Sequence, residues 1–275
     1  MLIVAEDSNC VSFISLSSGS NGNSYWFSNG EVSFLIDFGI GMRTARKRLA
    51  EHSVCLDNID FVLVTHDHID HIKHLGSLSE RSFKPICATE SLHKALNSHF
   101  VTRGKINLSK IIIESECQFE FNGVKITPFP VPHDGTDNYG YFINMSSIKI
   151  AVITDIGHVT DTVLKYASMA DHLIIESNYD SAMLESGPYP KVLIDRISKG
   201  RGHLSNAETA EAVKKIFHKN LKTLLLCHLS ANNNTPELAL ESTGMALLEK
   251  GAIPGVDLTL ECLPRGRASR MYKFE

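Results

Sequence analysis

The stretch that decides the fold is Phe61-Val62-Leu63-Val64-Thr65-His66-Asp67-His68-Ile69-Asp70-His71. Its first five residues are apolar or β-branched, which is typical of a strand buried on both faces. The histidines begin where this strand ends, and His66 and His68 point to the same side of an extended chain. Asp70 and His71 are adjacent at the start of a new turn, so they can be directed to a second centre a few ångströms away. We therefore expect one short loop to supply ligands to two metal ions.

The side chains of this loop favour a metal site over a loop that faces only water. Imidazole and carboxylate groups suit Zn, Mn or Fe, and no cysteine lies nearby in the sequence to supply a thiolate for a structural zinc site. So many titratable groups beside a buried strand would lower the stability of the fold unless a cation neutralised them. We therefore expect two divalent metal ions, either Zn, Mn or Fe, as the cofactors.

Two metal ions need more ligands than one loop provides, and other expected strands lead into suitable residues. His133, Asp155 and His228 each follow an apolar, strand-like run. A single histidine at such a position is more often structural, but three residues of this kind together with the loop favour a shared site. The two oxygens of the Asp155 carboxylate can bridge two cations.

The composition is that of an ordinary globular protein. Of the 275 residues, 43% are hydrophobic and 21% are charged, and no repeat or low-complexity tract marks a linker. We therefore expect a single domain over residues 1–275. The net charge of −4 gives no overall positive field, so any nucleic acid would have to bind a local patch.

Cysteine usage and the absence of long apolar runs predict the compartment. The six cysteines are dispersed and form no C-x-x-C pair, which is typical of reduced thiols. Glu6 and Asp7 stand where an export signal has basic residues, and nowhere do 18 apolar residues follow one another. We expect a cytoplasmic protein without a membrane partner.

The coarse pattern of strands and helices predicts an α/β fold. Alternating runs in the first half flank Asn29-Gly30 and Asn122-Gly123, which are strong hairpin signals. Ser205 and Glu208 form a capping box, and Thr235-Pro236 marks another helix start. Each half is expected to contribute one sheet followed by helices, so that two mixed β-sheets pack face to face with helices outside. The expected helices cover residues 42–52, 91–99, 160–169, 206–218 and 236–250.

The order of these motifs resembles that of the metallo-β-lactamase superfamily over nearly the whole chain. Asp37, in Leu35-Ile36-Asp37-Phe38-Gly39, is similar to the first-motif aspartate that orients the metal-binding loop in that superfamily. The resemblance implies the superfamily's αβ/βα sandwich. It also implies a ligand set, in which Asp155 bridges a first metal bound by His66, His68 and His133 and a second metal bound by Asp70, His71 and His228.

Segments around these ligands are similar to the WalJ/YycJ-type group of the superfamily, whose members are regarded as DNA exonucleases that work from the 5′ end. The segments cover residues 15–24, 176–180, 202–206 and 228–233. Gly202-His203-Leu204-Ser205 is also similar to a segment of tRNase Z whose histidine is placed to protonate the leaving group. The chain has no recognisable long basic arm of the kind many tRNase Z enzymes use to hold tRNA, so pre-tRNA is the less favoured substrate.

Phosphodiester cleavage fits these residues chemically. Paired divalent cations lower the pKa of water towards about 7 and stabilise the charge that develops on an attacked phosphate. Asp70 is expected to orient the nucleophile, and His203 to pass a proton to the departing oxygen. Glu176 would either tune His203 or line the wall. The expected substrate-binding residues are the polar side chains of two loops, namely Ser18, Ser20, Asn21, Asn23, Ser230 and Asn232.

Two basic segments either follow a phosphate backbone or are simply solvated. They are residues 191–201, which carry Lys191, Arg196, Lys199 and Arg201, and residues 265–273, which carry Arg265, Arg267, Arg270 and Lys273.

The sequence therefore predicts a dinuclear metal-dependent phosphodiesterase or nuclease, most concretely a 5′ to 3′ DNA exonuclease with DNA as its substrate. Three alternatives remain open. The first is a tRNase Z-like or small-molecule phosphodiesterase. The second is a hydrolase of a small ester, thioester or lactam, because the same activated water attacks carbonyl groups. The third is a metal-holding protein that recognises DNA ends without cutting them. The oligomeric state stays open.

Overall fold

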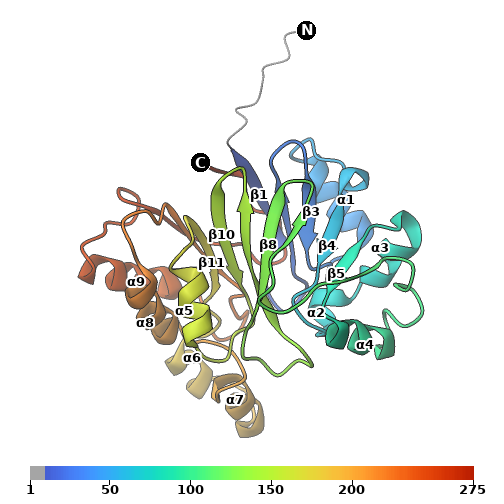
Figure 1. Ribbon diagram of the computed structural model, residues 1–275. Coiled ribbons are helices and arrows are strands. Elements are labelled where there is room, and N and C mark those ends of the chain that lie inside the picture. The colour runs from blue at the N-terminus through green and yellow to red at the C-terminus, as the bar shows by residue number, and fades with distance from the viewer. Residues whose placement is uncertain (1–9) are drawn as a thin grey trace.

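In the computed structural model, which describes residues 10–275, two mixed seven-stranded sheets pack face to face between outer helices (Figure 1). Glu6 and Asp7 of the export-signal argument lie outside the described residues. In spatial order the first sheet contains β14 (Tyr272–Phe274), β1 (Val11–Ser17), β2 (Ser24–Ser28), β3 (Ser33–Ile36), β4 (Phe61–Leu63), β5 (Ile86–Ala88) and β6 (Lys110–Ile112). The second contains β13 (Thr259–Cys262), β12 (Thr223–Cys227), β11 (His172–Glu176), β10 (Ile148–Ile153), β9 (Tyr139–Met145), β8 (Val124–Pro130) and β7 (Phe119–Phe121).

Helices cover the outer face of each sheet, and further helices lie near the ends of the strands (Figure 1). Those that follow strands of the first sheet are α1 (Met42–Ala50), α2 (Ile69–Ile72), α3 (Leu75–Ser82) and α4 (Glu90–Ser98), with a short 3₁₀ turn at Leu56–Asn58. Those that follow strands of the second sheet are α5 (Asp161–Ala167), α6 (Ser181–Ser186), α7 (Lys191–Ser198), α8 (Asn206–Ile216) and α9 (Pro236–Glu249).

Parallel strand pairs determine where the site lies. In the first sheet β3 runs parallel to β4, and in the second sheet β10, β11 and β12 are parallel. The carboxyl ends of parallel neighbours meet at one edge of a sheet, so the residues that follow these strands are gathered there. Asp37 and His66 follow strands of the first sheet, and Asp155 and His228 follow strands of the second.

The interface between the two sheets is apolar and rich in aromatic rings. Phe13, Phe27, Phe34 and Phe61 stand side by side on β1 to β4, with ring centroids 4.8 to 5.3 Å apart between neighbours. All four are fully buried against residues of the second sheet such as Tyr141. Burial of each such ring contributes about 1.5–3 kcal/mol, so this layer holds the two sheets together firmly.

The predicted αβ/βα fold class is confirmed, and the expected helices appear within two residues of their predicted bounds. The expectation that each half of the chain forms one sheet was wrong in one respect. The last strand, β14, pairs with β1 and so returns the C-terminal end of the chain to the first sheet. The predicted strand over 61–65 ends at Leu63, and the next residues are extended without ladder pairing. No helix among residues 10–275 is long and apolar enough to cross a bilayer.

Candidate metal centre

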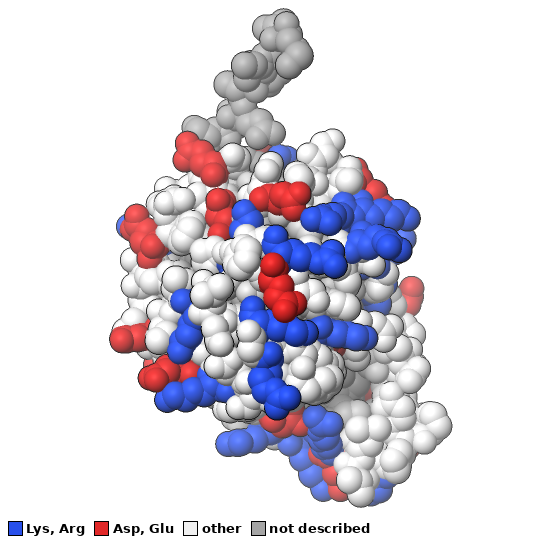
Figure 2. All heavy atoms as spheres, turned by 90° about the vertical axis from the view of Figure 1, so that its right-hand side faces the viewer, with Lys and Arg blue, Asp and Glu red and all other residues white. Residues whose placement is uncertain are grey.

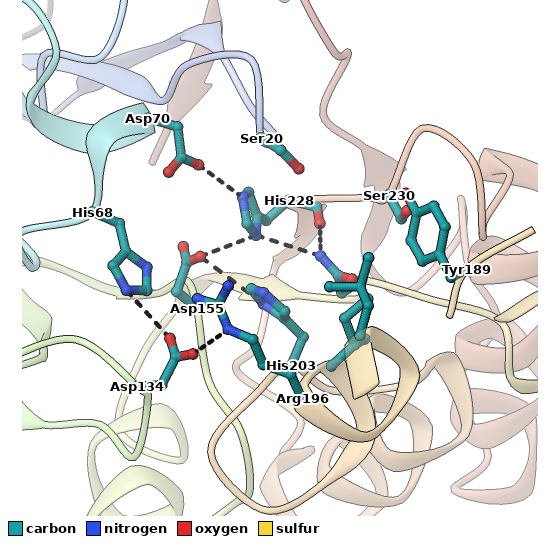
Figure 3. A pocket seen from close by; sticks show the side chains of 13 residues that line it. Ser20, His68, Asp70, Asp134, Asp155, Tyr189, Arg196, His203, His228 and Ser230 are labelled. Atoms are coloured by element: carbon teal, nitrogen blue, oxygen red, sulfur yellow. Dashed lines mark hydrogen bonds and ion pairs between the residues drawn. The ribbon is translucent and has the colours of Figure 1, made fainter. Parts of the chain in front are cut away.

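The edges of the two sheets meet around a cavity of about 290 Å³. Figure 3 shows His68 and Asp70 on one side of it, His203 and His228 on the other, and Asp155 between them. Nine residues were predicted as ligands or supports, and eight of them belong to groups that could hold a metal ion. Within each group, one ligand atom of every residue lies within 4.8 Å of the others. The ninth, Asp37, is completely buried and lies directly behind His71.

The first group consists of His66, His68 and His133. His133 donates from Nδ1 to the carbonyl oxygen of Gly202 at 2.7 Å, which leaves Nε2 free to coordinate. That Nε2 lies 3.2 Å from Nδ1 of His68. The Nδ1 of His66 is 2.9 Å from the hydroxyl of Thr65, and its Nε2 is buried with no hydrogen-bond partner in the described chain. One ring nitrogen of each of these imidazoles therefore lies within 4.8 Å of the other two.

The second group consists of Asp70, His71 and His228. His71 donates from Nδ1 to Asp37 at 2.7 Å, so the tautomer that presents Nε2 to the cavity is fixed. His228 donates from Nδ1 to Glu176 at 2.9 Å. Its Nε2 is buried without a hydrogen-bond partner among residues 10–275 and lies 3.5 Å from a carboxylate oxygen of Asp70.

Asp155 lies between the two groups. One carboxylate oxygen is 3.2 Å from Nε2 of His71, and the other is 3.2 Å from Nδ1 of His228 and 3.9 Å from Nε2 of His133. Its two carboxylate oxygens therefore face imidazoles of both groups.

Three residues of this centre adopt a backbone conformation that is uncommon outside glycine. Asp37 has φ of +61°, and Asp155 and His228 each have φ of +52°. Each residue directly follows a strand, or nearly so, and the left-handed conformation turns the chain at that point. Backbone strain of this kind persists where packing enforces it, and it gathers at functional sites.

Burial and nearby carboxylates shift the pKa values of these imidazoles in opposite directions. Desolvation lowers the pKa of His66 well below its usual value, and it lowers that of His133 as well. Burial alone would do the same to His71 and His228, but the carboxylates around them outweigh it, so the pKa of His71 rises and that of His228 rises to about 10. The same imidazoles hold the pKa of Asp155 well below its usual range, against the effect of burial. A largely buried set of carboxylates and imidazoles is a donor set that can bind a divalent cation once the imidazoles give up their protons.

His203 and Glu176 form a second, connected unit. Glu176 is fully buried and accepts hydrogen bonds from the backbone N–H groups of Ile156 and Leu204. Its other oxygen accepts from Nδ1 of His203 at 2.8 Å. Burial would lower the pKa of His203, but Glu176 raises it on balance. His203 lines the cavity, so a proton held on this ring faces the place where a substrate would lie.

The six predicted substrate contacts fall into three classes. Ser20 and Ser230 line the cavity, as Figure 3 shows. Asn21 and Asn232 are exposed outside its lining, and Asn232 donates to the hydroxyl of Tyr189 at 2.9 Å.

Ser18 and Asn23 are fully buried and support the metal centre instead. Ser18 accepts from the backbone N–H of His228 at 2.9 Å, and Asn23 donates to Asp70 at 3.1 Å. The direct substrate contact predicted for these two residues does not match this placement, because their polar atoms already have protein partners.

Sequence reasoning missed several residues of the cavity wall, among them Asp134, Asn178 and Tyr189. Asp134 connects the metal centre to α7, because its carboxylate lies 3.2 Å from Nε2 of His68 and accepts from Nε of Arg196 at 2.7 Å (Figure 3). The position of Asp134 directly after His133 is the one signal that could have indicated it.

The basic side chains of the two segments have different surroundings, even within one segment. Lys191 and Lys199 pair with Asp195 at 3.4 and 3.1 Å and are solvated, whereas Arg196 lines the cavity. In the C-terminal segment Arg270 pairs with Glu261 at 2.7 Å.

Comparisons with known proteins agree with this geometry. The sequence model of the β-lactamase superfamily domain matches residues 33–228. Exodeoxyribonuclease YycJ of Bacillus anthracis is 32% identical over 240 residues, which are 87% of this chain and 90% of the relative. Exodeoxyribonuclease WalJ of Streptococcus pneumoniae is 34% identical over 226 residues, which are 82% of this chain and 83% of the relative.

Among solved structures, the metallo-β-lactamase fold protein YhfI of Bacillus subtilis matches with a TM-score of 0.68 at 18% identity, covering 96% of this chain and 99% of that one. At this identity the match supports the fold alone. The resemblance expected from the motifs is therefore confirmed, and the chain belongs to the metallo-β-lactamase superfamily, in the group of the YycJ and WalJ proteins.

Proposed function

We propose that this chain is a dinuclear metal-dependent nuclease that removes nucleotides from the 5′ end of DNA. The observation that carries the proposal is the convergence of two buried ligand groups on Asp155, with the Nε2 atoms of His66 and His228 lacking hydrogen-bond partners within residues 10–275. The relatives named exodeoxyribonuclease over more than four fifths of the chain favour DNA as the substrate.

The residues fit two divalent cations. His66, His68 and His133 would hold one, Asp70, His71 and His228 the other, and Asp155 would contact both. Zn, Mn and Fe all accept this set of imidazoles and carboxylates. When bound, the cations would activate water as the nucleophile and stabilise the charge that develops on the attacked phosphate.

The chain's own groups supply orientation and a proton. Asp70 reaches the cavity with a carboxylate that can accept a hydrogen bond from the attacking water. His203, kept protonated at Nδ1 by Glu176, can give a proton from Nε2 to the departing 3′ oxygen. Ser20 and Ser230 lie on the cavity wall, where they can contact the phosphate or the sugar of the terminal nucleotide.

End-labelled DNA tests this function. Protein stripped of metal and then loaded with Mn or Zn should release labelled mononucleotides from the 5′ ends of a phosphorylated duplex before any 3′ label appears. His68→Ala should abolish release because it removes a predicted ligand, whereas His99→Ala, at a half-exposed histidine outside the cavity lining, should not.

Other outcomes would identify another function. Metal-loaded protein that leaves DNA, RNA and bis(p-nitrophenyl) phosphate intact would refute the proposal. Turnover of nitrocefin or lactoylglutathione that exceeds phosphodiester turnover would indicate a hydrolase of carbonyl compounds. Preferential processing of pre-tRNA would indicate a tRNase Z-like enzyme, and DNA binding without product would indicate an end-binding protein.

A further inference from the structure

A strongly basic surface lies on the side of the molecule that carries α1 and α3. Figure 2 shows Lys and Arg side chains gathered there, with fewer acidic ones among them. Two hollows lie on it. One, of about 400 Å³, is lined by Arg43, Lys47, Arg48 and Arg267, with Glu51 as its acidic residue. The other, of about 540 Å³, is lined by Arg43, Arg46, His74 and Arg81 and by no carboxylate among the described residues. We call these two hollows the basic face.

Most of the charge on the basic face is not neutralised by the protein. Within residues 10–275, no carboxylate oxygen lies within 4.0 Å of a side-chain nitrogen of Arg43, Lys47, Arg81 or Arg267. Arg46 pairs with Asp57 at 3.2 Å, but both side chains are at least half exposed and such a pair is weak. Arg48 is different, because it donates to the carbonyl oxygens of Leu16 and Gly266 and so fixes α1 to neighbouring loops.

The sequence of α1 builds this surface. Met42–Ala50 contains four basic residues and no acidic one, while its apolar side chains Ala45 and Leu49 are buried against the sheet. The helix therefore packs against the sheet through its apolar side and exposes basic side chains on the opposite side. With a rise of about 1.5 Å per residue, α1 spreads these charges over roughly 13 Å, which is the separation of a few successive phosphates on a DNA strand.

The basic face begins beside the metal-binding loop. The segment that leads into α1 is bonded to the metal-binding loop, because the N–H of Phe38 donates to the carbonyl of His71 at 2.8 Å and the carbonyl of Phe38 accepts from the N–H of His74 at 3.1 Å. A Cβ atom added to Gly41, which caps the start of α1, would lie 3.8 Å from Nε2 of His74. The start of α1 is therefore held next to the loop that supplies the predicted ligands.

We propose that the basic face binds the phosphate backbone of the duplex DNA beyond the nucleotide being removed. This inference rests on the proposed nuclease function. A duplex fits better than a single strand, because proteins that hold single strands stack bases on aromatic side chains, and the described lining of the two hollows contains no aromatic residue other than His74. The hydroxyls of Thr44 and Ser77 add donors for phosphate oxygens.

A triple charge reversal tests the surface separately from catalysis. The variant carries Arg43→Glu, Lys47→Glu and Arg81→Glu, all at exposed positions. Its matched control carries Lys215→Glu, Lys219→Glu and Lys250→Glu, at exposed positions on and beside α8 and α9 on the opposite side of the molecule (Figure 1). Binding is measured by fluorescence anisotropy on metal-loaded protein, with a duplex whose terminal linkages are phosphorothioates that resist cleavage.

We expect the test variant to bind the duplex about 100-fold more weakly than wild type at about 0.15 M salt, and the slope of log K against log salt to fall by about 3, one unit for each lost phosphate contact. The control should change neither quantity by a comparable amount. Both variants should hydrolyse bis(p-nitrophenyl) phosphate at the wild-type rate, since this small substrate does not reach α1. A neutral variant with Gln at the same three positions should show a smaller loss in the same direction.

Duplex affinity that survives the triple reversal would overturn the inference, as would wild-type protein that does not bind duplex DNA. Loss of affinity for an RNA duplex alone, with DNA binding intact, would also overturn it. The proposed function can fail independently of this inference. If wild type binds the duplex through the basic face but never cuts an unmodified duplex, the basic face binds DNA and the proposed nuclease function is wrong.

Discussion

At the scale of single residues, Asp37 has the clearest role that does not involve touching a substrate. One of its carboxylate oxygens accepts from Nδ1 of His71 and from the hydroxyl of Thr65, both at 2.7 Å, and the other accepts from the backbone N–H of Thr65 at 2.8 Å. Thr65 in turn contacts Nδ1 of His66. Asp37 therefore orients one imidazole of each ligand group.

We predict that Asp37→Asn weakens metal binding by about 10- to 100-fold, because the anionic partner that fixes these imidazoles is lost. Metal content after dialysis against buffers of defined free zinc measures the effect. Asp57→Asn, the same change at an exposed carboxylate, serves as the control. Wild-type zinc affinity in Asp37→Asn would show that Asp37 does not orient the ligands.

His203 should matter for the leaving group and not for the metal. We predict that His203→Asn keeps the wild-type metal content and lowers kcat on DNA by about 10²- to 10⁴-fold, the usual contribution of a general acid. The loss should be much smaller on bis(p-nitrophenyl) phosphate, because p-nitrophenolate departs without a proton. An equal loss on both substrates would mean that His203 acts by some means other than proton donation.

Sequence patterns predicted the candidate ligands because each follows an apolar run that must be buried, and a buried strand leaves its next polar residue at a sheet edge. The same reasoning could not separate Ser20, which lines the cavity, from Ser18, whose hydroxyl accepts from the backbone of His228. A loop rich in Gly, Ser and Asn has the same composition whether it faces water or packs beneath a ligand. That distinction depends on contacts between residues 210 positions apart in the chain.

At the scale of elements, the metal-binding loop depends on a close backbone contact between Gly39 and Asp70. A Cβ atom on Gly39 would lie 1.7 Å from the carbonyl oxygen of Asp70, whereas a Cβ on Gly41 would meet nothing closer than 3.8 Å. Gly39 is therefore the point at which the β3 end and the ligand loop touch through their backbones.

We predict that Gly39→Ala displaces the Asp70 loop, lowers the free energy of unfolding by at least about 1–3 kcal/mol and weakens metal binding, because two backbone segments must move apart. Gly41→Ala, two residues away and without the clash, should leave metal affinity close to wild type. Urea unfolding and zinc titration of the two variants measure both effects. Equal behaviour of the two would contradict the close packing of β3 against the loop.

Elements with strong local signals were predictable, and those defined by tertiary contact were not. The capping box of Ser205 and Glu208 and the Thr235 cap mark α8 and α9 correctly. In contrast, α7 and β6 contain apolar side chains such as Ile194 and Ile111, but α7 buries no residue and every residue of β6 is exposed, so burial in the core does not define either element.

At the scale of the whole molecule, the return of the chain to its first sheet brings the C-terminal strand into contact with the second sheet. β14 pairs with β1, and Phe274 of β14 stacks on His172 of β11 with ring centroids 4.2 Å apart. Nothing local in the last residues predicts this closure, because a three-residue strand has too little pattern and its partner lies at the other end of the sequence. The burial of His172 therefore depends on the packing of one sheet against the other.

The stability of that docking should depend on pH through His172. Burial lowers its pKa from the ordinary 6.5 to about 4, although the nearby Asp171 and the C-terminal backbone oppose the shift and Lys222 assists it. The folded protein therefore holds this imidazole neutral, while the unfolded chain takes up a proton as the pH falls below about 6.5. The stabilisation is complete above that pH and is lost progressively as the pH falls towards 4, which amounts to about 3 kcal/mol in all.

We predict that His172→Phe, which keeps the stacking but cannot titrate, reduces the loss of unfolding free energy between pH 7.5 and about pH 4.5 by about 2–3 kcal/mol relative to wild type. Urea unfolding of metal-free protein at the two pH values measures this difference, and other titrating groups cancel between the two proteins because they are common to both. His99→Phe, the same change at a half-exposed position, is the matched control. The same pH dependence in His172→Phe as in wild type would mean that the contact between β11 and β14 does not hold the imidazole in its neutral form.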